Sequence, residues 1–124
     1  MTKDEILDKE LCNLYAIAKQ VNQYFNDSDI SFLSERMQLL LVDYIKFSCA
    51  NEEKVSHSLR NLNINPGNTT DSIVQEITEN LRAITVQKGV DNDVKEMGFT
   101  FSLNRLITYH AANIDNLDFR GRNL

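Results

Sequence analysis

A chain of 124 residues, of which 42% are hydrophobic and 25% charged, fits one folded globular domain (1–124) and not a disordered segment. The net charge of −5, with basic residues gathered only at Arg120 and Arg122, disfavours a phosphate-binding surface and therefore a nucleic-acid partner. No apolar run approaches the roughly 18 residues that a membrane span needs, so no membrane partner is expected.

The first predicted helix covers residues 3–25. Its apolar residues recur every three or four positions, which is the period of one helix face. They are Leu7, Leu11, Leu14, Ala18, Val21 and Phe25. A turn is expected at 26–29, and either Ser31 or Ser34 can cap the helix that follows.

The second predicted helix covers residues 31–62 and is the longest. The face that we expect to be buried consists of Leu33, Met37, Leu41, Tyr44, Ser48, Asn51, Val55, Leu59 and Leu62. Pro66 cannot continue a helix and Gly67 relaxes a turn, so these two residues are expected to end it.

The third predicted helix covers residues 70–88. Thr69, Thr70 and Asp71 are candidate caps, and Ser72 with Gln75 also fits a capping box. Its expected stripe consists of Ile73, Ile77, Leu81 and Ile84. Gly89 suits the position just past the end of a helix.

The fourth predicted helix begins near Asp91 or Asp93 and ends near Leu117, with a tail at 118–124. Its apolar face consists of Phe99, Leu103, Leu106, Ile107, His110, Ile114 and Leu117. Gly98 allows a kink, and the opposite face also carries apolar residues, namely Val94, Met97 and Phe101. The sequence therefore predicts an all-α, antiparallel four-helix bundle.

Histidines and acids on these helices are candidate metal ligands. Glu53 and His57 are four residues apart on the outer side of the second helix, where they form at most a weak surface pair and no half of a metal site. His110 lies on an apolar face and is expected to be a hydrogen-bonded core residue. The alternative is a ligand or acid–base group, for which Glu10 and Glu52 are the candidate partners.

Polar residues also interrupt the buried face of the second helix at Ser48 and Asn51. Residues in such positions can fix the register between helices, or they can line a small polar cavity. Tyr109 is expected at the boundary of the core, with a buried ring and a hydroxyl in water.

The segment DKELCNLYAIAKQV (8–21) resembles the opening helix of the ferritin-like YciF/YciE stress-protein family, in its acid–Leu, Leu–Tyr and Lys–Gln pairs. LRNLNINP (59–66) and LNRLITYHAANI (103–114) are similar to the family's second and later helices. The resemblance implies a ferritin-like bundle and a role in stress response.

The same resemblance implies that the family's metal ligands are missing from this chain. Its ligand positions correspond to Ala18 in the first helix, to Tyr44 and Phe47 in the second, and to the run from Ile107 to His110 in the later one. We therefore expect no di-metal centre, no cofactor and no catalytic residue.

Three functions remain open. The preferred one is a non-catalytic bundle that acts by protein interaction or in a stress response, with a protein partner or self-association as a homodimer. The second is a metal-binding oxidoreductase or metal store with a rearranged site at His110, Glu10 and Glu52. The third is a small immunity or inhibitor protein. No secretory leader is visible, and Cys12 and Cys49 lack the spacing of a disulfide framework, so a cytoplasmic location is expected.

Overall fold

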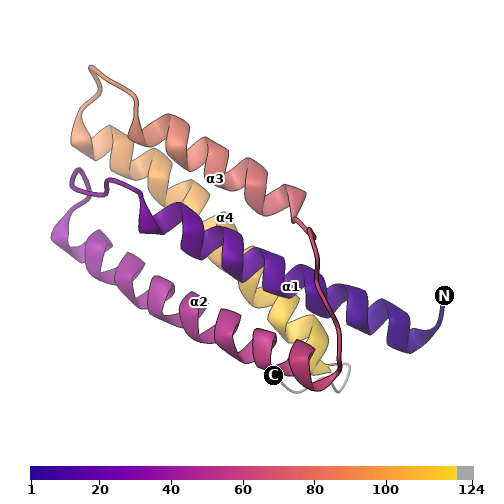
Figure 1. Ribbon diagram of the computed structural model, residues 1–124. Helices are drawn as coiled ribbons and strands as arrows, with labels where there is room; N and C mark the ends of the chain where they lie inside the picture. Colours follow the sequence, from indigo (N-terminus) through magenta and orange to yellow (C-terminus); the bar gives the residue numbers. More distant parts are fainter. Residues whose placement is uncertain (120–124) are drawn as a thin grey trace.

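A computed structural model describes residues 1–119 of the chain, and it confirms the all-α four-helix bundle. The helices are α1 (Lys3–Asn26), α2 (Glu35–Asn61), α3 (Ser72–Thr85) and α4 (Asn92–Phe119). Consecutive helices run in opposite directions, so α2 and α4 run the same way (Figure 1). No helix within the described residues is long and apolar enough to cross a membrane.

Three helices begin at a residue whose side chain accepts a hydrogen bond from the first turn. Thr2 caps α1, Ser34 caps α2 and Asp71 caps α3. Such a cap satisfies one of the backbone N–H groups that have no partner within the helix. Ser34 and Asp71 were both among the predicted caps, whereas the first helical residue comes later than expected in α2 and in α3.

Helix α2 ends within one residue of the predicted position 62 but at a different stop signal, and α3 ends three residues before the predicted position 88. Leu62, expected on the buried face of the second helix, is 47% exposed because it follows the end of α2. Asn63, with a φ of 57°, ends α2 three residues before Pro66, and the N–H of Ile64 donates to the carbonyl of Leu59 at 2.9 Å. This left-handed turn satisfies the last carbonyls of the helix, and asparagine tolerates it well. Helix α3 stops at Thr85, so Gly89, with a φ of 74°, belongs to the α3–α4 loop.

The buried side of α3 is also turned slightly from the predicted one. Val74 and Leu81 are fully buried, whereas Ile73 is 48% exposed. Ile77 and Ile84 are partly buried against the core as predicted. The stripe therefore starts at Val74, because the buried cap Asp71 fixes the phase of the first turn.

Helix α4 runs without interruption from Asn92 to Phe119 and includes Gly98. A Cβ at Gly98 would lie 3.6 Å from Ile84, an ordinary contact, so no neighbour forces glycine at this position. Residues 118 and 119, expected in the tail, continue the helix, while 120–124 lie outside the described residues.

Helix α1 is the centre of the bundle. It packs against α2, α3 and α4, while α3 packs on α4, and α2 has its main contacts with α1. The fully buried apolar residues come from all four helices and include Leu14, Ile17, Leu41, Val55, Leu81, Leu103 and Leu106. The seam between α2 and α4 is therefore the least closed side of the bundle.

Candidate functional site

The core contains one hydrogen-bonded cluster of polar side chains that joins α2 to α4. His110 of α4 is fully buried. Its Nδ1 lies 2.9 Å from the hydroxyl of Tyr44, and its Nε2 lies 3.0 Å from Oδ1 of Asn51. The seven-residue spacing places Tyr44 and Asn51 on the same face of α2, on either side of the imidazole.

This geometry suits a neutral imidazole with its proton on Nε2. Oδ1 of Asn51 can only accept, so Nε2–H donates to it, and Nδ1 accepts from the Tyr44 hydroxyl. Burial lowers the pKa of His110 to about 4 and raises the pKa of Tyr44. Both groups are therefore uncharged at neutral pH, and both ring nitrogens already have partners.

Two further residues of α2 border the cluster. The ring of Phe47 meets the imidazole edge-on, with centroids 5.6 Å apart, although Phe47 is 47% exposed. Ser48 is fully buried, and its hydroxyl has no hydrogen-bond partner among the described atoms. The hydrogen bond between Asn51 of α2 and His110 of α4 agrees with the hypothesis that Asn51 fixes the register between helices.

The structure does not bring the three candidate metal ligands together. His110 is bound to Tyr44 and Asn51, while Glu52 accepts a hydrogen bond from Asn22 at 2.8 Å. Across residues 1–119, no three His, Cys, Asp or Glu side chains form a group that could hold a metal ion.

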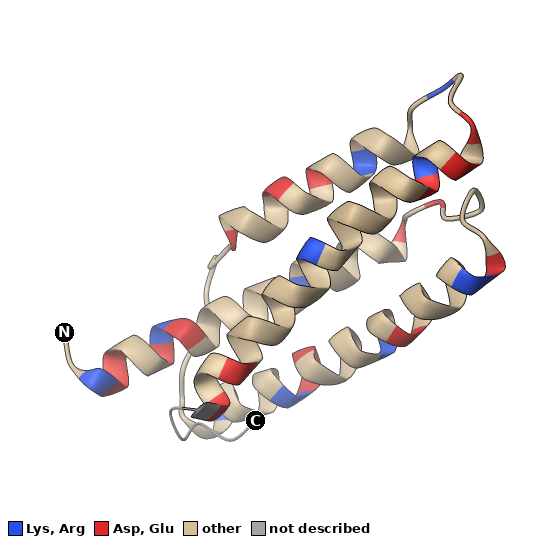
Figure 2. Cartoon of the chain, turned by 180° about the vertical axis from the view of Figure 1, so that it is seen from behind, with Lys and Arg blue, Asp and Glu red and all other residues tan. Residues whose placement is uncertain are grey.

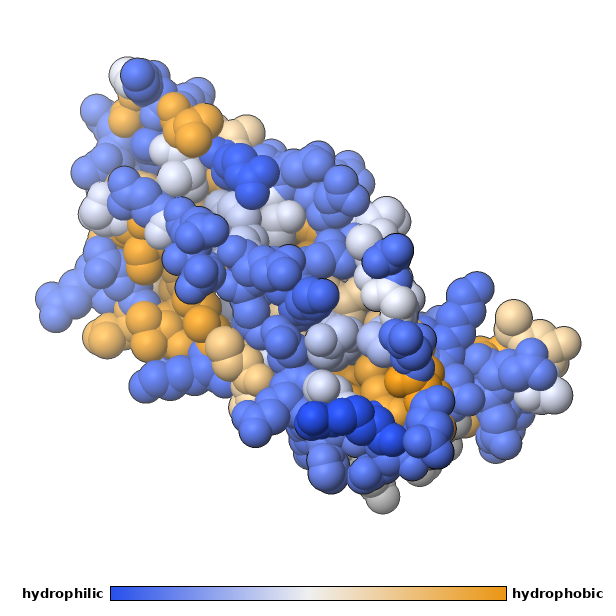
Figure 3. Space-filling view, in the orientation of Figure 1, coloured by the Kyte–Doolittle hydropathy of each residue, from blue (hydrophilic) through white to orange (hydrophobic). Residues whose placement is uncertain are grey.

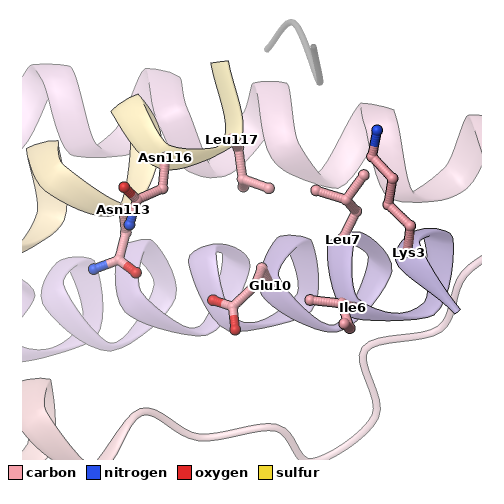
Figure 4. Close-up of a pocket in the computed structure, with 7 residues that line it drawn as sticks. All are labelled: Lys3, Ile6, Leu7, Glu10, Asn113, Asn116 and Leu117. Carbon is pink, nitrogen blue, oxygen red and sulfur yellow. The ribbon is translucent and has the colours of Figure 1, made fainter. Parts of the chain in front are cut away.

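Glu10, the third candidate, lies on a groove of about 760 Å³ between the start of α1 and the end of α4. Leu7 and Leu117 lie between the two helices, and Glu10 and Asn113 lie along the rim (Figure 4). Glu10 is the only acid in the lining, which contains no histidine or cysteine. The groove is thus a mainly apolar surface feature.

Glu53 and His57 are both exposed, as the helical-wheel argument predicted. Their side chains point away from the core that α1 and α2 share, so neither contributes to the polar cluster.

A second polar centre, at Asp71, was missed beyond its role as a cap. Asp71 is only 4% exposed, and its carboxylate accepts hydrogen bonds from three elements. The donors are the N–H of Val74 at 2.8 Å, the amide of Asn13 at 2.9 Å and the hydroxyl of Tyr109 at 2.7 Å. This carboxylate therefore holds α1, α3 and α4 together.

The backbone of Asp71 is held as well. The side-chain amide of Gln20 accepts from its N–H at 2.7 Å and donates to its carbonyl at 3.1 Å. Burial and the bond to Asp71 raise the pKa of Tyr109 to about 12. Tyr109 lies at the boundary of the core as predicted, but its hydroxyl, which was expected in water, donates to the carboxylate of Asp71. The cap signal at Asp71 was visible in the sequence, but its long-range donors were not.

No protein-family model, curated protein or solved structure matches this chain. The assignment of a function therefore depends on the residues and their geometry.

Proposed function

We propose that this protein is a non-catalytic helical bundle that acts by binding another protein, a second copy of itself included. The observation that carries the proposal is a set of large apolar residues that are exposed on α2 and α4. It consists of Leu39, Leu40, Phe47, Val94, Met97 and Phe101. Their exposed fractions lie between 43% and 63%.

Helix α4 supplies three of these residues, Val94, Met97 and Phe101, on the side opposite His110. Between residues 97 and 114 its sequence contains one charged residue, Arg105, and the cartoon of charges shows a helix that is almost entirely uncharged between its ends (Figure 2). A helix that faces water on one side normally carries charges there. An apolar outer side is instead typical of a helix that is covered by a partner.

Helix α2 carries the other three residues, on different sides from those of α4. Leu40 and Phe47 are seven residues apart and thus share one side of the helix. The ring of Phe47 reaches His110 of α4, so this side faces the α2–α4 seam. Apolar atoms also gather over the first half of α2 in the space-filling view (Figure 3). A hydrogen bond at 2.6 Å from the N–H of Ser34 to Glu96 joins the starts of the two helices.

The polar cluster supports the non-catalytic part of the proposal. Tyr44 and His110 stand where the family resemblance places metal ligands, and here they bind each other in a buried, neutral pair. We infer a ferritin-like bundle that has replaced a metal site with a structural one. A role in stress response follows from the same resemblance, and the free thiols of Cys12 and Cys49 support a cytoplasmic location.

The test is affinity capture with two variants of the immobilised protein. We expect the wild type to retain one protein in stoichiometric amount, either another protein or the free chain itself. The double variant Met97→Glu/Phe101→Glu should lose it, because two carboxylates would be buried in the contact. Ile6→Glu, a change at a similarly exposed residue at the far end of α1, should retain it. Equal capture by all three proteins would contradict the proposal.

A further inference from the structure

The outer side of α4 has a regular pattern of side-chain size. Val94, Met97, Phe101, Asn104 and Thr108 follow one another at spacings of three and four, the pattern of a packing seam. The first three are large, apolar and 57–60% exposed. The seam continues with small residues at Ala111 and Ala112. The N-terminal part of this side of α4 therefore carries large protruding side chains, and its C-terminal part carries small ones.

The C-terminal part forms a hollow. A depression of about 550 Å³ is lined by Asn104, Arg105, Thr108, Tyr109 and Ala112, and its surface is mostly apolar. It begins one helical turn after Phe101. A protruding aromatic ring and a shallow apolar hollow thus lie side by side on one helix.

We propose that the partner of the outer side of α4 is a second copy of this chain, with the two α4 helices packed antiparallel about a two-fold axis. Phe101 of each copy inserts into the hollow between Asn104 and Thr108 of the other. Met97 then lies opposite Thr108 of the second copy, and Val94 lies opposite Ala111. Each large side chain meets a small one, which is the complementarity that a symmetric contact requires.

Charge favours this contact in spite of the net charge of −5 on each copy. No carboxylate belongs to the central part of the seam, because Asp93 and Asp115 lie at its two ends. The one charged residue that lines the hollow is Arg105, whose guanidinium would border the inserted Phe101 ring, a favourable cation–π arrangement.

The large apolar residues of α4 supply part of the area that a dimer contact needs. Val94, Met97 and Phe101, with roughly 100 Å² exposed on each, give on the order of 300 Å² of apolar surface per copy, and the residues that line the hollow add to it, in a standard interface of about 800 Å² per copy.

This inference rests on the proposed function and is tested separately by measuring mass in solution. Size-exclusion chromatography with light scattering on the full chain should give twice the chain mass at micromolar concentration. Phe101→Glu should give the monomer mass, and so should Thr108→Trp, which fills the hollow without adding charge. Ile6→Glu should remain a dimer. Helical circular dichroism checks that each variant is folded, and Thr108→Trp decides the matter if Phe101→Glu does not fold.

A wild-type monomer at every concentration would overturn the second copy as partner, and so would a dimer that survives both substitutions. If another protein is then captured in a Phe101-dependent manner, the proposed function stands while this inference fails. If neither self-association nor capture depends on Phe101, both fail.

Discussion

The hydroxyl of Tyr44 and Nδ1 of His110 lie 2.9 Å apart in the core, although 66 residues separate them in the chain. Together with Asn51, this pair makes the histidine a structural element of the bundle. Both ring nitrogens are satisfied, so the imidazole is tolerated in an apolar environment.

His110→Ala should lower the free energy of unfolding by about 2–4 kcal/mol, because it leaves a cavity and removes a partner from two buried polar groups. The exposed His57 serves as the matched position, where His57→Ala should change stability by less than about 0.5 kcal/mol. Urea denaturation of both variants at pH 7 provides the measurement. Equal midpoints would show that His110 is not held as described.

The free energy of unfolding should decrease as the pH is lowered, because His110 becomes protonated. Its pKa is about 4 in the folded protein, below the ordinary value of 6.5, so the unfolded state binds the proton more readily. The contribution of His110 is complete above pH 6.5, is lost progressively down to about pH 4, and amounts to roughly 3 kcal/mol. In denaturation series over this range, His110→Gln should show a shallower slope than the wild type. An unchanged slope would assign the acid sensitivity to carboxylates.

Asp71→Ala should be among the most destabilising single changes in a polar residue, at about 2–4 kcal/mol. It removes a helix cap, worth about 1 kcal/mol, and leaves the donors on Asn13 and Tyr109 without an acceptor. Thr2→Ala removes only an exposed cap and should have an effect of about 1 kcal/mol or less. Thermal unfolding of the two variants shows whether Asp71 joins three helices or only caps α3. Similar melting temperatures would contradict the role of Asp71 in joining α1, α3 and α4.

Gly98→Ala should stabilise the protein by about 0.5–1 kcal/mol. Alanine lowers the entropy of the unfolded chain, and the new methyl group would make an ordinary contact with Ile84. A rise in melting temperature is expected. A fall would mean that α4 needs the flexibility of glycine at this point.

Metal content decides between an interaction module and a metal enzyme. Protein purified without an affinity tag from medium with added iron, manganese and zinc should contain well below one metal ion per chain. This is expected because both ring nitrogens of His110 already have hydrogen-bond partners. Stoichiometric metal that disappears in His110→Ala would instead favour an oxidoreductase or a metal store.

Sequence patterns predicted the features that depend on a single helix. The period of apolar residues was sufficient to assign the four helices, the buried faces of α1 and α4, the buried face of α2 apart from Leu62, which is 47% exposed, and the outer position of His57. It also placed His110, Ser48 and Asn51 on buried faces. These features depend only on the 3.6-residue turn, which is the same in every α-helix.

Features that depend on the relative placement of helices could not be predicted in this way. The partner of His110 was unknown because it depends on how far α4 is shifted along α2, and the loops set this shift. Asp71 appeared only as a cap, since Asn13 and Tyr109 approach it from helices that are distant in sequence. The stop signal of α2 also differed, since the left-handed turn at Asn63 comes before Pro66 and Gly67.

The clamp of Tyr44 and Asn51 on His110 has a mechanical consequence for α4. A slide by one helical turn, about 5.4 Å, would break both hydrogen bonds at once and leave three buried polar groups without partners. This cost favours a single register of α4 along α2. The bundle should therefore resist sliding of α4 along α2. A partner of the outer side of α4 would then meet side chains whose positions along the bundle are fixed.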